Sequence, residues 1–422
     1  MISNALPNAD DITRVVFHNG LTVLIRENHS APVVVAEGYI PAGSVHEPAE
    51  KAGLSSFVAS MLTRGSARYT FDNFNETVEA LGASLGAGSD NHYTNFSTTS
   101  LSEDFPQMMQ ILADILRNPL FPAEQVERVR RQKLVRLQER AQDTNRMASL
   151  RFYESIYGHH PYGRAVSGYT ESVRAIVQED LVAFHADYYT PNGAVLVVVG
   201  DVETQQALDL IHAQLGSWSG TKVDQQVPPI ASVGSQQILH PMADKFQADL
   251  VIGAPAISRQ HPDYFAVRVA NTILGQFGMM GRLGERVREE QGLAYYSYSS
   301  LDSEFHAGVW VAQAGINPAN VQQATESILT EFARLGDELV PAEELADTPA
   351  YMTGVVPLTL ETNAGVASTL LNMEWYSLGL DYLERYRDLI YNITAADVQR
   401  VAAQYIRPDL CTVVVAGPDL VE

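Results

Sequence analysis

The fold is decided by a stretch that occurs twice in the chain. Residues 179–200 read EDLVAFHADYYTPNGAVLVVVG, and residues 396–417 read ADVQRVAAQYIRPDLCTVVVAG. Both stretches predict a helix, then a turn at proline, then an all-apolar strand. The two copies share four residues at one offset of 217, namely Asp180 with Asp397, Tyr188 with Tyr405, Pro191 with Pro408 and Gly200 with Gly417.

Two shorter pairs of similar segments lie upstream of this stretch. FPAEQVE at 121–127 resembles VPAEELA at 340–346, and DTNRMAS at 143–149 resembles ETNAGVAS at 361–368. The offsets stay between 217 and 219, so the order and spacing of the elements persist through half the chain. Chance similarity would not hold one register for so long. The sequence therefore predicts two copies of one α+β unit.

The boundary between the copies is predicted at residues 221–234. The surrounding segment is polar, contains Pro-Pro and has no clear periodicity, which is typical of a linker. We therefore expect an N-terminal domain over 1–220 and a homologous C-terminal domain over 235–422. Each copy starts with strands, passes through helices and returns to a strand. This order predicts a mixed, mainly antiparallel sheet with helices packed on one face.

The first copy opens with two β-branched runs, 21–26 and 33–40, which are predicted to pair as strands. A helix is predicted over 52–66, because its apolar residues recur at i, i+3, i+4, i+7 and i+8. The opposite side of that helix presents Ser56, Ala59 and Ser60, which are small and mostly polar.

Further elements of the first copy follow the same reasoning. Thr70 is predicted to cap the next helix, and the glycine-rich GASLGAGS (82–89) is interpreted as a link into a strand over 92–100. Long helices are predicted over 105–117 and 122–140.

One stretch of the second copy combines charge and aromatic residues. In GRLGERVREEQGLAYYSY, 281–298, a charged helix ends at Gly292 and an alternating aromatic strand follows. Arg288 and Tyr295 lie seven residues apart across this junction. A guanidinium and a phenol that converge can clamp a carbonyl oxygen as it becomes an oxyanion. Spacing alone favours the alternative, a solvated arginine and a core tyrosine.

Composition restricts the possible functions. A chain of 422 residues suits two domains, and 46% hydrophobic residues provide a large core. The net charge of -22 argues against nucleic-acid binding, because phosphate contacts need a basic surface. No apolar run is long enough for a membrane span. The first residues show no signal peptide, so we expect a cytoplasmic protein, or a periplasmic one if a leader has been removed.

Five motifs together resemble a known family. They are NGLTVLI at 19–25, GLSSFVASMLTRGS at 53–66, the tetrapeptide His160-Pro161-Tyr162-Gly163, PLTLETN at 357–363 and RVREEQGLAY at 286–295. The chain resembles the pitrilysin-like inverzincins, the zinc peptidases with an H-x-x-E-H helix that include mitochondrial processing peptidase and insulin-degrading enzyme. The resemblance implies two homologous α+β domains in a clamshell arrangement, with two such chains enclosing a peptide chamber.

The zinc motif departs from the family pattern. Where active members carry two histidines, a glutamate between them and a later glutamate, the matching positions here are Ser56, Ser60, Ala59 and about Arg136. Imidazoles at i and i+4 bind one ion together, whereas serine is a poor zinc ligand and arginine repels a cation. The resemblance therefore implies that this chain binds no catalytic zinc and needs no cofactor of its own.

The arginine and tyrosine of the family's active site have counterparts in this sequence. The family's arginine and tyrosine, seven residues apart, contact the substrate beside the scissile bond, and by motif they map to Arg288 and Tyr295. Glu79 and Gly86 occupy roughly the equivalent positions of the first copy. We expect Tyr296 and Tyr298 to face the other side of the strand and to serve packing.

The resemblance implies a non-catalytic subunit of a heterodimeric zinc metallopeptidase. Such a chain is inactive alone, binds unfolded peptides, and donates Arg288 and Tyr295 to the zinc site of a homologous H-x-x-E-H partner. The alternative is a catalytically inactive structural or peptide-binding protein, like the core subunits of respiratory complexes. A homodimer of the isolated chain is compatible with either interpretation.

Overall fold

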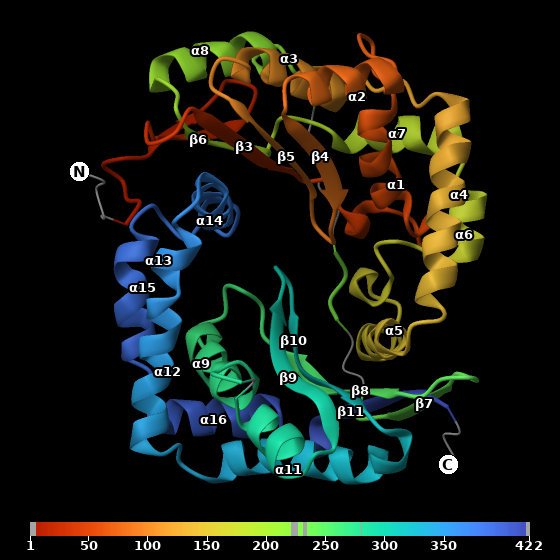
Figure 1. The fold of residues 1–422 in the computed structure, drawn as a ribbon, viewed down its shortest axis with the longest axis vertical. Coiled ribbons are helices and arrows are strands. Elements are labelled where there is room, and N and C mark those ends of the chain that lie inside the picture. The colour runs from red at the N-terminus through yellow and green to blue at the C-terminus, as the bar shows by residue number, and fades with distance from the viewer. Residues whose placement is uncertain (1–5, 221–226, 231–233, 280, 419–422) are drawn as a thin grey trace. The chain divides into compact units, whose positions relative to one another are not determined.

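The computed structural model describes residues 6–220, 227–230, 234–279 and 281–418 (Figure 1). These residues form two compact units. Unit 1 comprises Met1–Leu137, Ala165–Val227 and Pro357–Glu384, and unit 2 comprises Gln138–Arg164, Pro228–Val356 and Arg385–Glu422. Each unit thus contains a segment from the other half of the chain. Most of the predicted linker, 221–226 and 231–233, lies outside the described residues, and the boundaries 1–220 and 235–422 stay a prediction.

Unit 1 is built on a six-stranded mixed sheet in the order β1-β2-β6-β3-β5-β4. Only the β2–β6 pair is parallel. Every residue of β6 is buried, as its all-apolar sequence predicts. The strands are β1 (Thr13–Val16), β2 (Thr22–Glu27), β3 (Val33–Ile40), β4 (Ser84–Ser89), β5 (Thr94–Leu101) and β6 (Val195–Gly200).

The helices of unit 1 carry the apolar faces that the sequence predicts, and the side chains of α1 and α3 contribute to the hydrophobic core. Thr70 caps α2 by accepting a hydrogen bond from the Asn73 amide at 3.2 Å, as expected. The helices are α1 (Leu54–Met61), α2 (Phe71–Ala80), α3 (Phe105–Arg117), α4 (Ala123–Arg140, whose last three residues belong to unit 2), α6 (Thr170–Ala175), α7 (Gln178–Tyr188), α8 (Thr204–Leu215) and α14 (Asn363–Trp375).

Unit 2 repeats this plan with five strands in the order β7-β11-β8-β10-β9. Its all-apolar last strand, β11, is fully buried like β6. Only the β11–β7 pair is parallel. The strands are β7 (Gln237–Pro241), β8 (Ala248–Ala256), β9 (Ala294–Ser303), β10 (Gly308–Ile316) and β11 (Thr412–Gly417), and the main helices are α5 (Thr144–Tyr157), α9 (Tyr264–Gly275), α11 (Val321–Asp337), α12 (Ala342–Gly354), α15 (Tyr382–Tyr391) and α16 (Ala395–Tyr405).

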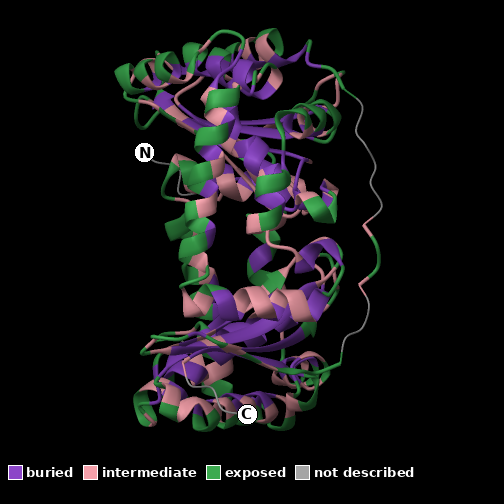
Figure 2. Cartoon of the chain, turned by 90° about the vertical axis from the view of Figure 1, so that its right-hand side faces the viewer, coloured by how far each residue is buried: buried purple, intermediate pink, exposed green. Residues whose placement is uncertain are grey.

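The two halves exchange one helix each. Helix α5, from the first half, packs on β8 and β11 of unit 2, and α14, from the second half, packs on β3 and β6 of unit 1. In Figure 1, α14 lies across the sheet of unit 1 from α2, α3 and α8, and α5 lies across the sheet of unit 2 from α11 and α16. The central strands β3, β6, β8 and β11 are therefore covered on both faces and are largely buried (Figure 2), whereas buried and exposed residues alternate along most of β5. The predicted α+β fold is confirmed. The exchanged helices α5 and α14 are an addition to the predicted plan.

Two local predictions are wrong. Strands β2 and β3 do not pair, because β6 lies between them and pairs with both. An all-apolar strand is most stable when both its edges and both its faces are covered, and this position supplies that cover. The segment 82–89 is also more than a link, since β4 (Ser84–Ser89) pairs with β5. No helix among the described residues is long and apolar enough to cross a membrane.

Candidate functional site

The segment 281–303 forms a helix, a glycine turn and an edge strand in unit 2. A short helix, α10 (Gly281–Leu283), continues into a π-helical turn, η5 (Gly284–Glu290). Gly292 follows with φ of 62°, in the left-handed region that glycine adopts without strain. Strand β9 then begins at Ala294. The predicted helix, stop and strand are present, but a π-helix replaces the expected α-helix.

Arg288 and Tyr295 lie on either side of this glycine turn. Arg288 is in the last part of η5, and 35% of its side chain is exposed. Its ion-pair partner is the adjacent Glu289, with Nε 3.6 Å from Oε1. Tyr295, the second residue of β9, is 63% exposed. Among the described residues no hydrogen bond joins the two side chains, and both are accessible to an external group.

A β-bulge explains the exposure of Tyr295. Along β9 and β10 the register is regular as far as the pair Tyr296 and Gly315, and the next pair is Ala294 with Ile316. Tyr295 is thus the extra residue, with no partner in the ladder. A bulge re-aims the side chain of its extra residue, and bulges are frequent beside active sites. The tyrosine therefore is not a core residue, contrary to the alternative that spacing favours.

Tyr296 and Tyr298 take part in polar packing, as their position in the strand predicts. The Tyr296 hydroxyl donates to the buried carboxylate of Asp249 and accepts from Nδ2 of Asn145 at 2.7 Å. The Tyr298 hydroxyl donates to Oε1 of Gln313 at 2.9 Å. Burial and the Asp249 carboxylate raise the pKa of Tyr296 well above its usual value. This network connects β9 to α5, and sequence periodicity alone gives no sign of it.

The first-copy helix that the resemblance assigns to the zinc motif is α1 in unit 1. Ser56 and Ser60 are half-buried on α1, and Ala59 is 2% exposed. The Ser60 hydroxyl donates to the Ser56 carbonyl at 2.7 Å. At the start of α1 the carboxylate of Glu47 accepts hydrogen bonds from the amides of Gly53 and Ser55, both at 2.8 Å. A carboxylate at this helix terminus satisfies free amides and suits the helix dipole.

A buried lysine faces this helix. Lys133 of α4 is 8% exposed, and its ammonium donates to Oγ of Ser56 at 2.8 Å. Burial, with a smaller contribution from the charge of Arg136, lowers the pKa of Lys133 to about 8, and the Glu47 carboxylate opposes this shift. Arg136 is exposed on the same helix. Sequence reasoning identified Arg136 and missed Lys133, although a lysine on the apolar stripe of α4, between Val129 and Leu137, is a detectable signal.

These residues do not fit a zinc ion. Serine hydroxyls are poor zinc ligands, and the Lys133 ammonium occupies the side of Ser56 that faces α4. A cation bound there would be repelled by both Lys133 and Arg136. Across the described residues no group of three or more histidine, cysteine or acidic side chains is arranged to hold a metal. We therefore derive no chemistry from a metal in this chain.

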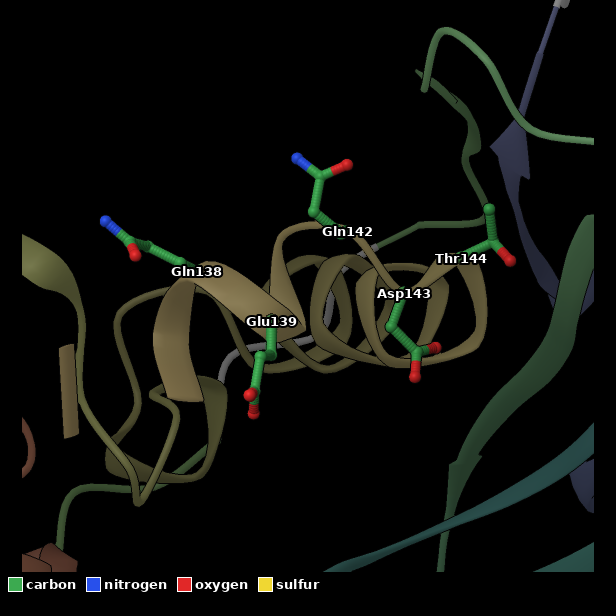
Figure 3. A pocket seen from close by; sticks show the side chains of 5 residues that line it. All are labelled: Gln138, Glu139, Gln142, Asp143 and Thr144. Atoms are coloured by element: carbon green, nitrogen blue, oxygen red, sulfur yellow. The ribbon is translucent and has the colours of Figure 1, made fainter. Parts of the chain in front are cut away.

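Two surface pockets of the described residues, one in each unit, are lined by none of the residues predicted for the site. One pocket, in unit 2, lies where α4 meets α5 and is lined by Gln138, Glu139, Gln142, Asp143 and Thr144 (Figure 3). In Figure 3 these side chains point in different directions rather than converging. This pocket is thus a surface hollow without a focused set of functional groups.

Comparisons with known families identify both halves of the chain. Residues 22–169 match the family model for insulinase, peptidase family M16, and residues 175–348 match the model for the peptidase M16 inactive domain. Together the two models span most of the chain. The order of the two models agrees with the internal repeat.

Curated relatives carry the names of peptidases and of respiratory subunits. The chain is 27% identical to an uncharacterized zinc protease of Mycobacterium leprae, over 94% of this chain and 89% of the relative. It is 26% identical to the mitochondrial-processing peptidase subunit beta of Bos taurus, over 78% and 69%. It is 30% identical to the cytochrome b-c1 complex subunit 1 of the same species, over 61% and 54%.

A solved structure shows the same fold. The crystal structure of a peptidase M16 inactive domain from Pseudomonas fluorescens superposes with a TM-score of 0.90 at 26% identity, and the match covers 97% of this chain and 98% of that one. The family models, the curated relatives and this structure agree with each other and with the motifs. The chain is a pitrilysin-like member of peptidase family M16.

Proposed function

We propose that this chain is the non-catalytic subunit of a heterodimeric zinc metallopeptidase. In this role it forms half of a peptide-binding chamber and donates Arg288 and Tyr295 to the active site of a homologous partner that carries H-x-x-E-H. The zinc belongs to the partner, and the substrates are unfolded peptides. The observation that carries the proposal is a contrast between two places in the chain. Arg288 and Tyr295 are accessible, whereas α1 presents serine hydroxyls, one of them bonded to Lys133 of α4, instead of metal ligands.

The exposure of the arginine and tyrosine supports donation to another chain. A fully internal tyrosine would satisfy its hydroxyl within its own unit, as Tyr296 does with Asp249. Tyr295 instead projects from a bulge, with 63% of its surface accessible. Arg288 keeps five donors, and its one ion-pair partner is the exposed neighbour Glu289. Both side chains are thus available to a substrate.

The chemistry of the two groups suits peptide-bond hydrolysis. A neutral phenol donates a hydrogen bond to the oxyanion of a tetrahedral intermediate, and a guanidinium orients and polarises the carbonyl. The partner's zinc supplies the activated water when it is bound. Because these donors act where charge develops, they stabilise the transition state more than the ground state.

Reconstitution with the partner tests the proposal. A homologous chain with intact H-x-x-E-H is co-expressed, and zinc-dependent peptide cleavage is measured for each chain alone and for the mixture. We expect activity only in the mixture. Arg288→Ala and Tyr295→Phe should each lower kcat by about a hundred- to a thousandfold, because each removes one oxyanion donor, without dissociating the pair.

Matched variants separate donation from general damage. Arg286→Ala removes another exposed arginine of η5, and Tyr298→Phe removes another phenol of β9 that faces Gln313. Both controls should retain activity within a few-fold. Unchanged turnover in both the Arg288 and the Tyr295 variants would refute the donated site, as would full cleavage activity of this chain alone.

The second candidate function is a structural or peptide-binding protein without a role in catalysis. The likeness to cytochrome b-c1 complex subunit 1 favours it. Such a protein keeps the two units but does not need Arg288 and Tyr295. Absence of any neighbouring reading frame for an H-x-x-E-H homologue, together with purification as a stable homodimer, would favour this candidate.

A further inference from the structure

Four cations gather on the side of unit 1 where η3 (Leu62–Arg64) meets α4. They are Arg64, Arg128, Lys133 and Arg136. The chain as a whole has a net charge of -22, so such a cluster opposes the general charge balance. Within the described residues, no ion pair joins any of the four to a carboxylate, whereas Arg130 on the same helix pairs with Glu127 at 3.0 Å. The cluster therefore carries a net positive charge, and the Glu47 carboxylate acts on Lys133 without forming an ion pair with it.

An aromatic ring holds two of these cations together. The guanidinium of Arg64 lies 4.5 Å from the ring centroid of Phe71, and that of Arg128 lies 5.0 Å from the same centroid. Both distances are within the range of a cation–π interaction. Like charges held this close repel each other unless an anion lies between them. The Phe71 ring thus holds the guanidinium groups of Arg64 and Arg128 in place without neutralising the charge of either.

One buried donor of the cluster lacks an acceptor, and the Lys133 ammonium, which also lies 5.6 Å from the ring centroid of Phe57, has N–H groups to spare. Nε of Arg64 is buried and has no hydrogen-bond partner among the described residues. Lys133 has three N–H groups, and one of them is used on Oγ of Ser56. The one carboxylate that acts on Lys133 is Glu47, whose two oxygens already accept the Gly53 and Ser55 amides. Buried donors of native proteins normally have acceptors, so these vacancies point to an external acceptor.

The charges of the cluster act on each other. Burial lowers the pKa of Arg64, and the positive charges of Arg128 and Arg136 lower it further. Burial and the charge of Arg136 together lower the pKa of Lys133 to about 8. A bound anion would reverse these effects, since an opposite charge favours the protonated forms.

We propose that Arg64, Arg128, Lys133 and Arg136 form a binding site for a peptide carboxylate. This inference rests on the proposed function and names its substrate class, namely peptides with a free C-terminal carboxylate or an acidic side chain. The carboxylate accepts hydrogen bonds from Arg64 and Lys133, and Arg128 and Arg136 flank it. A planar guanidinium suits a carboxylate because its donors match both oxygens.

Peptide binding to the isolated chain tests this site without any cleavage. The probe is a short fluorescein-labelled peptide rich in glutamate, compared with the same peptide in which glutamine replaces glutamate. Each is made with a free and with an amidated C-terminus, and fluorescence anisotropy is recorded at low and high salt. We expect the glutamate peptide, the free C-terminus or both to bind, and the neutral amidated peptide to bind at least tenfold more weakly.

Variants assign the binding to the cluster. Lys133→Met and Arg136→Glu should each weaken binding roughly ten- to a hundredfold, because each removes a charged donor. Arg131→Gln, an exposed arginine of α4 for which the structure records no contact with the other four, should leave binding unchanged. Unfolding curves recorded in parallel should show that Arg136→Glu remains folded, because the position is exposed.

Two results would overturn the site. One is equal binding of the acidic and the neutral amidated peptide, and the other is a Kd that neither Lys133→Met nor Arg136→Glu changes. Failure here is distinguishable from failure of the proposed function. The binding assay contains no partner and no zinc, whereas the Arg288 and Tyr295 variants are measured by turnover of the pair.

Discussion

The two copies of the repeat contain the same helix–glycine–strand connection, and they differ in its detail. In unit 1, α2 leads through Gly82 into the edge strand β4, and in unit 2, η5 leads through Gly292 into the edge strand β9. The two glycines have nearly the same φ, 59° and 62°. The connections are thus equivalent, but the helix is an α-helix in one and a π-helix in the other.

The helix ends differ by one residue. At the end of α2 the Ala83 amide donates to the Val78 carbonyl at 3.1 Å, which is the usual pattern for a helix ending in glycine. At the end of η5 the Leu293 amide donates to the Val287 carbonyl at 3.0 Å, one residue further back. The π-turn therefore accommodates one extra residue in the second copy.

The strands differ in the same way. Strand β4 pairs with β5 without interruption, from Ser84 with Thr99 to Ser89 with Thr94. Strand β9 has a bulge, with Tyr295 as its extra residue. Single-residue insertions on both sides of one turn, in one copy only, are typical of a functional site.

Removing the extra residue of η5 would abolish the difference between the two helix ends, and we expect it to have the largest effect. Deletion of Glu290 should restore an α-helical end like that of α2 and turn Arg288 away from its direction, because one residue rotates a helix by about 100°. We expect about a hundredfold loss of kcat in the reconstituted pair, similar to Arg288→Ala. Peptide cleavage by the mixture measures it.

The control for this deletion is Glu290→Ala. It removes the same ion pair with Arg286 and keeps the length of the turn, so activity should stay within a few-fold. Wild-type turnover in the deletion variant would show that the π-turn does not position Arg288.

A second comparison concerns the buried position of α4 and its counterpart in α12. At the repeat offset of 219, Lys133 corresponds to Met352, which is 4% exposed. Lys133→Met therefore places the residue of the second copy into the first. At pH 7 we expect a gain of about 2 kcal/mol in the free energy of unfolding, because a buried charge that costs about 3 kcal/mol is removed and one hydrogen bond worth about 1 kcal/mol is lost.

The effect should depend on pH in one direction. Because the pKa of Lys133 is lowered to about 8 in the folded protein, the unfolded chain binds the proton more tightly. The wild type carries the full destabilisation below pH 8 and loses it as the pH rises toward its unfolded value, about 10.4. The advantage of Lys133→Met should shrink over that interval in urea unfolding. A constant difference at every pH, or a clear loss of stability at pH 7, would contradict this account.

The smallest expected effects concern the caps of the two exchanged helices. Asp143 accepts from the Arg146 amide at the start of α5, and Thr362 accepts from the Gly365 amide at the start of α14, both at 3.0 Å. Asp143→Ala and Thr362→Ala should each lower the free energy of unfolding by about 1 kcal/mol. The conservative variants Asp143→Ser and Thr362→Ser should retain most of the stabilisation that each cap provides. Equal stability of the alanine and serine variants would show that neither cap contributes.

Much of the fold follows from local patterns in the sequence. The apolar stripes predict α1, α3 and α4, Thr70 predicts the start of α2, and the repeat predicts two α+β units. The insertion of β6 between β2 and β3 could not be predicted this way. Periodicity states which face of a strand is buried, but it does not state which neighbour covers an edge.

Part of the candidate site could likewise be predicted from the sequence, and part could not. The spacing of Arg288 and Tyr295 and the family motifs identify the pair from the sequence. The π-turn and the bulge that expose Tyr295 depend on hydrogen bonds between residues whose order the sequence pattern does not reveal. The contact of Lys133 with Ser56 joins residues 77 positions apart, so no local pattern could identify it.

The sequence by itself determined that the chain is a duplicated α+β protein whose helix α1 carries Ser56, Ala59 and Ser60 on one side. Only the tertiary structure decided that α5, from the first half of the chain, packs in unit 2 and that α14, from the second half, packs in unit 1. The physical reason is that the two helices are copies of one ancestor with similar apolar faces, so composition does not distinguish which sheet each covers. Connectivity and the specific contacts at their ends, such as that of Asn145 with Tyr296, make that choice.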